Sequence, residues 1–153
     1  MVTSGSSRDS AMVQAILDLV AAVPELGPIV ESDRGCDGEI LAYIALARFR
    51  WSLVEFVEAG NEAAIAAFLA EVERLAGSPS DSVRNLIAIA FLEDGVILSG
   101  GRERDALTSL LPRFGLGTMT LLAETEAHYA SLVELSRTRP HGKRHGRRDS
   151  PSW

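Results

Sequence analysis

The sequence predicts an all-α protein, a single compact bundle of five to six helices around a buried central helix at about residues 82–94. Three observations lead to this prediction. No segment keeps the alternation of apolar and polar residues that marks a strand, and helix-forming residues dominate. Glycine and proline residues divide the chain into segments of helical length. The 153 residues, 46% of them hydrophobic, have the size and composition of one globular domain.

The first two helices are separated by prolines and an acidic stretch. Apolar periodicity predicts a helix at about 10–22, which Pro24 and Pro28 end because proline cannot continue a helix. The stretch ESDRGCDG then reads as an acidic loop. A long helix is predicted at 39–59, and Gly60 closes it in the usual manner of a helix C-terminus.

The remaining helices are predicted from their caps and their apolar patterns. Asn61 is expected to cap a helix at 62–76, and Asp81 or Ser80 to cap the central helix. After a glycine-rich connection, DALTSLL is predicted to be helical. The glycines of RFGLG then interrupt the chain, and a last long helix is predicted at about 118–137.

Charge divides the chain into an acidic body and a basic tail. Residues 1–9 are predicted to be a disordered N-terminus, 10–136 the helical domain and 137–153 a disordered tail. The tail holds six Lys or Arg and one Asp, whereas residues 1–136 hold nine Arg and twenty Asp or Glu, a charge of −11. Such a body repels nucleic acid and favours a basic protein partner, so nucleic acid is expected only through the tail.

The predicted location is the cytoplasm, without membrane insertion. The longest apolar run, LIAIAFL, has seven residues, far below the roughly 18 that a membrane-spanning helix needs. The beginning MVTSGSSRDS lacks the apolar run of a secretory signal. A single cysteine, Cys36, fits a reducing compartment.

The polar residues of the central helix and of helix 39–59 raise a question of pairing. At 100° per residue, the apolar residues of the central segment fall all round its axis, which is typical of a helix in the middle of a bundle. Arg50 lies in the column of Tyr43 and Val57 on an apolar face, where an unpaired charge would be costly. The sequence therefore predicts an internal polar network of four residues: Glu39, Arg50, Asn85 and Glu93. A polar cleft, or an Arg50 that extends to the surface, remains the alternative.

No metal site, cofactor or catalytic group emerges from the motifs. DRGCDG resembles a calcium loop, but Gly35 and Ile44 occupy positions that need oxygen ligands, so an acidic surface loop is preferred. Glu124 and His128, four residues apart on one helix, could share a metal, although a surface pair is the simpler interpretation. The acidic surroundings of Cys36 disfavour a reactive thiolate.

Two blocks, DGEILAYIALARFRW and DSVRNLIAIAFLED, together with VPELGPIVE, resemble a family of small, uncharacterised, mainly bacterial helical proteins. The family shows an acid-Gly-Glu-x-Leu start and a Val-x-Asn-Leu-Ile-Ala-x-x-Phe-Leu-Glu block. The resemblance covers about residues 10–95 and brings no catalytic residues with it. Such proteins are similar to the small acidic immunity-like proteins that neutralise a bacterial toxin by binding it.

The function expected from these features is a non-enzymatic protein-binding module, of the immunity or antitoxin kind, for a basic partner protein. The alternatives are a metal-dependent hydrolase that uses Glu124 and His128, and a nucleic-acid or membrane-surface accessory that acts through the basic tail. The acidic residues expected to meet the partner are Asp33, Asp37, Glu55, Glu58 and Glu62.

Overall fold

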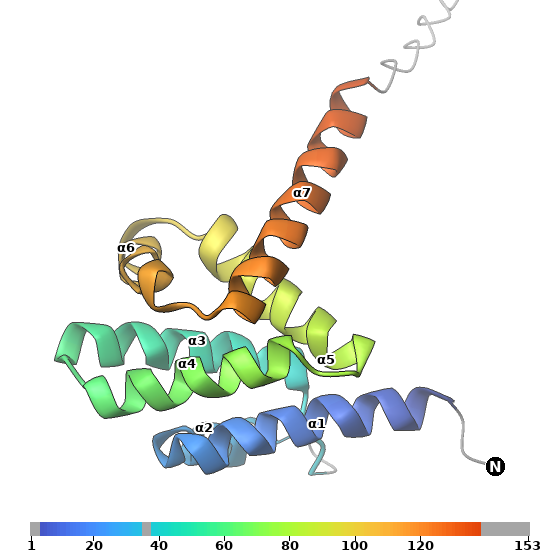
Figure 1. Cartoon of the computed structure of the whole chain (residues 1–153). Coiled ribbons are helices and arrows are strands. Elements are labelled where there is room, and N and C mark those ends of the chain that lie inside the picture. Colours follow the sequence, from blue (N-terminus) through green and yellow to red (C-terminus); the bar gives the residue numbers. More distant parts are fainter. Residues whose placement is uncertain (1–3, 35–37, 139–153) are drawn as a thin grey trace, which may run out of the picture.

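Helices account for nearly all of residues 4–34 and 38–138, which the computed structural model describes, and no strand occurs among them. The all-α prediction is confirmed. The α-helices are α1 (Ser4–Ala22), α2 (Gly27–Asp33), α3 (Ala42–Ala59), α4 (Glu62–Ala76), α5 (Asp81–Leu86), α6 (Gly101–Leu110) and α7 (Leu116–Thr138). The 3-10 turns η1 (Pro24–Leu26) and η3 (Leu111–Arg113) and the π-helical segment η2 (Ile87–Ile97) complete the architecture shown in Figure 1.

The helix caps lie where the sequence places them. Gly60 ends α3 in the left-handed conformation, with a φ of 69° that favours glycine. The side chain of Asn61 accepts a hydrogen bond from the backbone N–H of Ala64, at 3.3 Å, and begins α4. The side chain of Ser80 caps α5 in the same way.

Two boundaries differ from the prediction at the N-terminal end. Residues 1–9 were expected to be disordered, but helix α1 begins at Ser4, so residues 4–9 are helical. The acidic stretch expected as a loop is helical up to Asp33, in α2. Pro28 does not stop a helix there but lies in the first turn of α2, where its missing N–H costs no hydrogen bond. Cys36, Asp37 and the tail beyond Thr138 lie outside the described residues.

The predicted central helix is realised as α5 followed by η2. The η2 segment contacts α3, α4, α6 and α7, which places it at the centre of the bundle. Phe91 is fully buried, and its ring lies 5.9 Å from that of Phe68 in α4 and 6.1 Å from that of Phe114, measured between centroids. These tilted ring contacts anchor the core.

The central segment is not buried on every side, contrary to the prediction. Asn85 is exposed, and 42% of Ile89 is accessible to solvent. The η2 segment has the wide π-helical turn, in which the N–H of Leu98 donates to the carbonyl of Glu93, five residues earlier. Asn85 and Ile89 are four residues apart and lie on one side of the central segment, and this side stays open.

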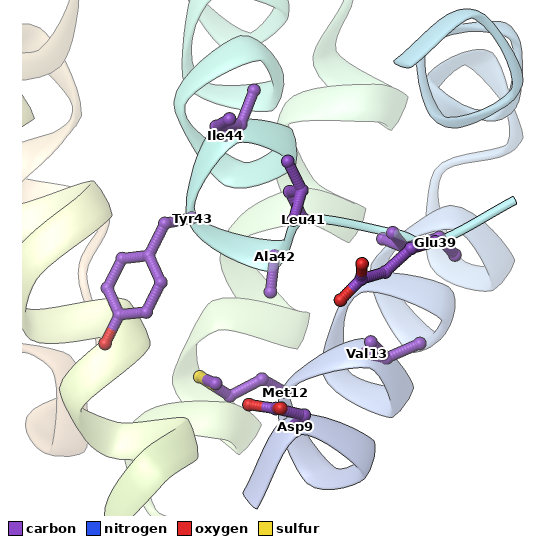
Figure 2. A pocket seen from close by; sticks show the side chains of 9 residues that line it. Asp9, Met12, Val13, Glu39, Leu41, Ala42, Tyr43 and Ile44 are labelled. Atoms are coloured by element: carbon purple, nitrogen blue, oxygen red, sulfur yellow. The ribbon is translucent and has the colours of Figure 1, made fainter. Parts of the chain in front are cut away.

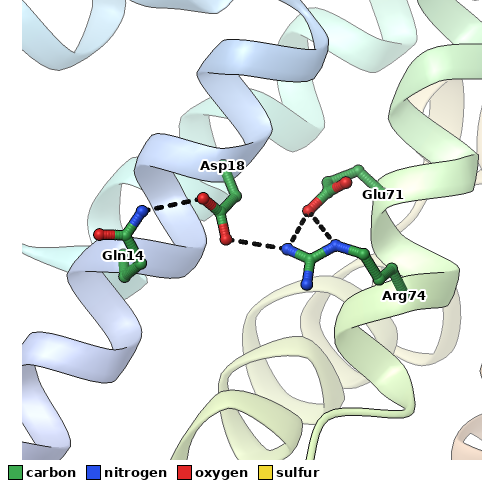
Figure 3. A network of polar contacts seen from close by, with 4 residues as sticks. All are labelled: Gln14, Asp18, Glu71 and Arg74. Atoms are coloured by element: carbon green, nitrogen blue, oxygen red, sulfur yellow. Dashed lines mark hydrogen bonds and ion pairs between the residues drawn. The ribbon is translucent and has the colours of Figure 1, made fainter.

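A polar network joins α1 to α4 at the surface (Figure 3). Arg74 donates to Asp18 of α1 at 2.8 Å and, through Nε, to Glu71 of its own helix at 2.9 Å. Gln14 donates to the other oxygen of Asp18 at 2.9 Å. The network aligns α1 with α4 above their apolar contact, in which Ile16, Leu19 and Val72 are fully or almost fully buried.

The carboxylate of Glu73 in α4 fixes the beginning of α7. It accepts hydrogen bonds from the backbone N–H groups of Gly117, at 2.6 Å, and Thr118, at 2.8 Å, and from the Thr118 hydroxyl. These N–H groups have no partner within the helix. A carboxylate beside them also interacts favourably with the positive end of the helix dipole. A Cβ on Gly117 would lie only 2.7 Å from Glu73 Oε1, and one on Gly115 would overlap the carboxylate. The two glycines of RFGLG therefore create the space for this cap.

Helix α7 packs on the bundle only through its first part. Its buried residues are Thr118, Leu122 and Thr125. Thereafter every residue of α7 is exposed or only partly buried, and Figure 1 shows this part of the helix extending away from the other helices. The direction of the extension is set by the contacts of α7 with α4 and η2.

We expect Glu73→Gln to destabilise the protein by about 1–3 kcal/mol at neutral pH, because a charged acceptor with three hydrogen bonds is lost. Burial would raise the pKa of Glu73, but the hydrogen bonds from Thr118 and Gly117 outweigh it and lower the pKa below 4.5. A lowered pKa stabilises the fold above pH 4.5, and the stabilisation is lost as the pH falls through the folded-state value.

The measurement is the free energy of unfolding by denaturant between neutral pH and pH 3. The wild-type protein should lose more stability on acidification than Glu73→Gln, whereas Glu25→Gln, at an exposed position, should follow the wild type. If the free energy of unfolding changed with pH in the same way for the wild type and for Glu73→Gln, the role of Glu73 as a cap would be contradicted.

Candidate functional site

A surface groove of about 350 Å³ lies between the central segment and α7. Its wall on one side comes from α5 and η2, and on the other from the second to fourth turns of α7. The lining residues are Asn85, Ala88, Ile89, Glu93, Leu121, Glu124, Thr125 and His128. The open side of the π-helical segment and the Glu73 cap of α7 together create this groove, since one exposes its floor and the other places its wall.

Four polar residues that the sequence singled out for two different reasons meet in this groove. Asn85 and Glu93 were expected in the core, and Glu124 and His128 as a surface pair, yet all four line one site. Within the described part of the chain, none of their side chains has an ion pair or hydrogen bond to another group. Two unpaired carboxylates beside the exposed apolar side chain of Ile89 form an acceptor for a cationic group with an apolar stem.

The acidic surface predicted from sequence has a different character, because most of it is already paired with arginine. The pairs are Asp33 with Arg48, Glu58 with Arg102 and Glu62 with Arg113. The hydrogen bond from Arg102 lowers the pKa of Glu58, and the same guanidinium lies 5.1 Å from the ring centroid of Trp51. Glu55 is exposed and lines a shallow hollow with Trp51. These arginines compensate the charge of three of the five carboxylates that the sequence predicts as a partner surface.

Arg50 has a partly buried ion pair, but its partner is not one of those predicted. Its Nε donates to the carboxylate of Glu103 in α6, and its Nη1 donates to the carbonyl of Ala90 in η2. The side chains of Arg50 and Glu103 are only 14% and 18% exposed. A Cβ at Gly95 would lie 2.5 Å from Arg50 Cδ, so this glycine provides the room for the guanidinium. The pair joins α3, η2 and α6.

The predicted network of Glu39, Arg50, Asn85 and Glu93 is therefore corrected: Arg50 pairs with Glu103, whereas Asn85 and Glu93 line the groove and Glu39 lies beside α1. The apolar face on which Arg50 lies requires a partner for its charge, and the identity of that partner depends on how α6 packs against α3. Glu103 stands in a glycine-punctuated stretch that the sequence presented as a connection. One feature of the sequence could have indicated Glu103. It lies in the first turn of a helix, where an acidic side chain is stabilised by the helix dipole.

A second hollow, of about 410 Å³, lies between α1 and the beginning of α3. Figure 2 shows its lining side chains, which come from these two segments. The wall is mostly apolar, and Leu41 and Ile44 are 47% and 52% exposed. Asp9 and Glu39 also line it, which is where the structure places the predicted network residue Glu39.

Neither a metal cluster nor a membrane span is found in the described part of the chain. No three His, Cys, Asp or Glu side chains of residues 4–34 and 38–138 group as ligands for a metal ion. The helices in these ranges are also too short or too polar to cross a membrane.

A family model matches residues 16–113, which is more than half of the chain. The chain belongs to the family described as Domain of unknown function (DUF7674). This agrees with the resemblance of its central blocks to an uncharacterised family. The DUF7674 match begins within α1 and ends at η3, so it contains the η2 wall of the groove but not the α7 wall. No curated protein and no solved structure matches the chain.

Two substitutions test whether Arg50 contributes to stability through its ion pair and whether Asn85 lies in the exposed groove. We expect Arg50→Met to destabilise the protein by about 1–3 kcal/mol, because it leaves the half-buried Glu103 carboxylate and the Ala90 carbonyl without their donor. Asn85→Leu, at an exposed groove position, should change the stability by no more than about 0.5 kcal/mol. Equilibrium unfolding of both variants tests this. A large effect of Asn85→Leu, or none of Arg50→Met, would contradict the assignment of these residues.

Proposed function

We propose that this protein is a non-enzymatic binding module that takes up a basic segment of a partner protein in the groove between η2 and α7. The observation that carries the proposal is the contrast between two sets of carboxylates. Asp33, Glu58 and Glu62 on the surface of α2 to α4 have arginine partners within the chain, whereas Glu93 and Glu124 have none among the described residues. Carboxylates held near one another without a counter-ion favour the uptake of an external cation.

The shape of the groove suits an arginine or lysine side chain on a partner. The aliphatic stem would lie on Ile89 and Leu121, and the cationic end would reach Glu93 and Glu124. Asn85 offers an amide oxygen as a further acceptor. An arginine is favoured, because its planar guanidinium can bind two carboxylates at once.

The charge of the whole protein supports a basic partner as well. The −11 charge of residues 1–136 would attract such a partner from a distance and accelerate association, most strongly at low salt. In this proposal the protein acts in the cytoplasm as an inhibitor of the immunity or antitoxin kind, neutralising a basic protein by occupying its surface. The finer proposal rests on analogy, since small acidic helical proteins of this kind resemble immunity-like proteins that neutralise a toxin by binding it.

The test uses three forms of the tagged, full-length protein to capture partners from source cells, followed by affinity measurements with the captured protein. The groove variant is Glu93→Gln with Glu124→Gln. A control variant with the same change in net charge, Glu25→Gln with Asp105→Asn, alters exposed carboxylates away from the groove.

We expect a basic protein that binds the wild type and the control equally and binds the groove variant more weakly. The loss should be about 1.5–3 kcal/mol, since hydrogen-bonded charge pairs are removed, or roughly ten- to hundredfold in Kd. Equal retention by all three forms would contradict the role of the groove. Retention only of nucleic acid or lipid, lost when residues 139–153 are removed, would transfer the function to the tail.

A further inference from the structure

The projecting part of α7 carries an apolar stripe that the fold leaves uncovered. Leu122 and Thr125 are buried against the bundle, and the same side of the helix continues through Tyr129, Leu132 and Val133 with spacings of three and four residues. Leu132 is 49% exposed, and Tyr129 and Val133 are half-buried. The described residues thus form a helix face of core-like composition that has no partner beyond the third turn.

Two charged residues beside the stripe, Glu126 and Arg137, indicate the kind of partner that would cover it. Glu126 and Arg137 are eleven residues apart, which is close to three full turns of an α-helix, so they lie on the same flank of the stripe. Both are exposed, and neither has a partner among the described residues. A single helix cannot bring them together, because about 16 Å of helix axis separates them.

We propose that the projecting parts of α7 from two copies of this protein pair antiparallel about a two-fold axis at the height of Ser131. In this register Tyr129, two residues before the axis, meets Val133 of the second copy, two residues after it. Leu132, next to the axis, meets its own counterpart. A two-fold interface is self-complementary, so each of these contacts occurs twice.

The same register pairs the charges. Glu126 lies five residues before the axis and Arg137 six residues after it, so each carboxylate comes within one residue, about 1.5 Å along the helix, of the level of the second copy's guanidinium. In antiparallel helix pairs, equal flanks face one another, and Glu126 and Arg137 share a flank. Two intermolecular ion pairs therefore close the ends of the apolar contact, and they give the antiparallel orientation its specificity.

The size of the contact determines its strength. Residues 126–138 project over about 20 Å, and a two-helix contact of this length buries less than the roughly 1,600 Å² of a standard stable interface. The dimer is therefore reversible and depends on concentration. It does not use Glu93 or Glu124, so the pairing stands or falls independently of the ligand of the groove.

Sedimentation velocity of the full-length protein, from low micromolar to millimolar concentration, tests the pairing. The wild type should pass from monomer to dimer over this range. Leu132→Asp should remain monomeric, whereas Leu116→Asp, at a position that is 84% exposed at the other end of α7, should dimerise like the wild type. A wild type that stays monomeric throughout, or a Leu132→Asp variant that still dimerises, would overturn the proposal.

A charge exchange tests the register. Glu126→Arg alone and Arg137→Glu alone should each weaken self-association by roughly tenfold, because each variant faces like charges at both ends. When the two single variants are mixed, both ends regain opposite charges, and the mixture should form heterodimers more tightly than either variant forms homodimers. Unchanged self-association of the single variants, or a mixture without preferred heterodimers, would refute the antiparallel register.

Discussion

The placement of α7, and with it the groove beside η2, depends on one carboxylate, that of Glu73. By accepting the N–H groups at the beginning of α7, it fixes a helix that packs on the bundle over only its first turns. Hydrogen bonds from N–H groups that lack helical partners are directional, so they define the angle of the helix as well as its position. Both the groove beside η2 and the projecting part of α7 follow from that angle, because neither would exist if α7 lay flat on the bundle.

The fold could largely be predicted from the sequence, because its signals are local. Gly60 and Asn61 mark a helix end and a helix start by their own backbone chemistry, and α4 has the predicted bounds. The failures have physical reasons of the same local kind. Pro28 begins a helix rather than ending one, because its missing N–H costs no hydrogen bond in a first turn. Ile89 is apolar, yet it lies with Asn85 on the side of the central segment that the other helices leave open.

The site could be predicted only in part, because it depends on contacts between distant segments. The sequence showed that Asn85, Glu93, Glu124 and His128 were unusual, but it did not show that they share a groove, since α5, η2 and α7 meet only in the folded chain. Similarly, the burial of Arg50 required an acidic partner, whereas the choice of Glu103 depends on α6. The groove differs from most of the acidic surface of α2 to α4 in that its carboxylates have no arginine partner among the described residues, whereas Asp33, Glu58 and Glu62 do.

We infer that the fold holds carboxylates without an internal counter-ion in a groove that Glu73 positions. The most direct measurement is a titration of the isotope-labelled protein with a short arginine-containing peptide, followed through backbone amide chemical shifts. We expect the largest shifts at residues 85–93 and 121–128, and we expect Glu73→Gln to reduce them. Shifts concentrated around Glu55 and Glu58, or equal responses of the wild type and Glu73→Gln, would contradict it.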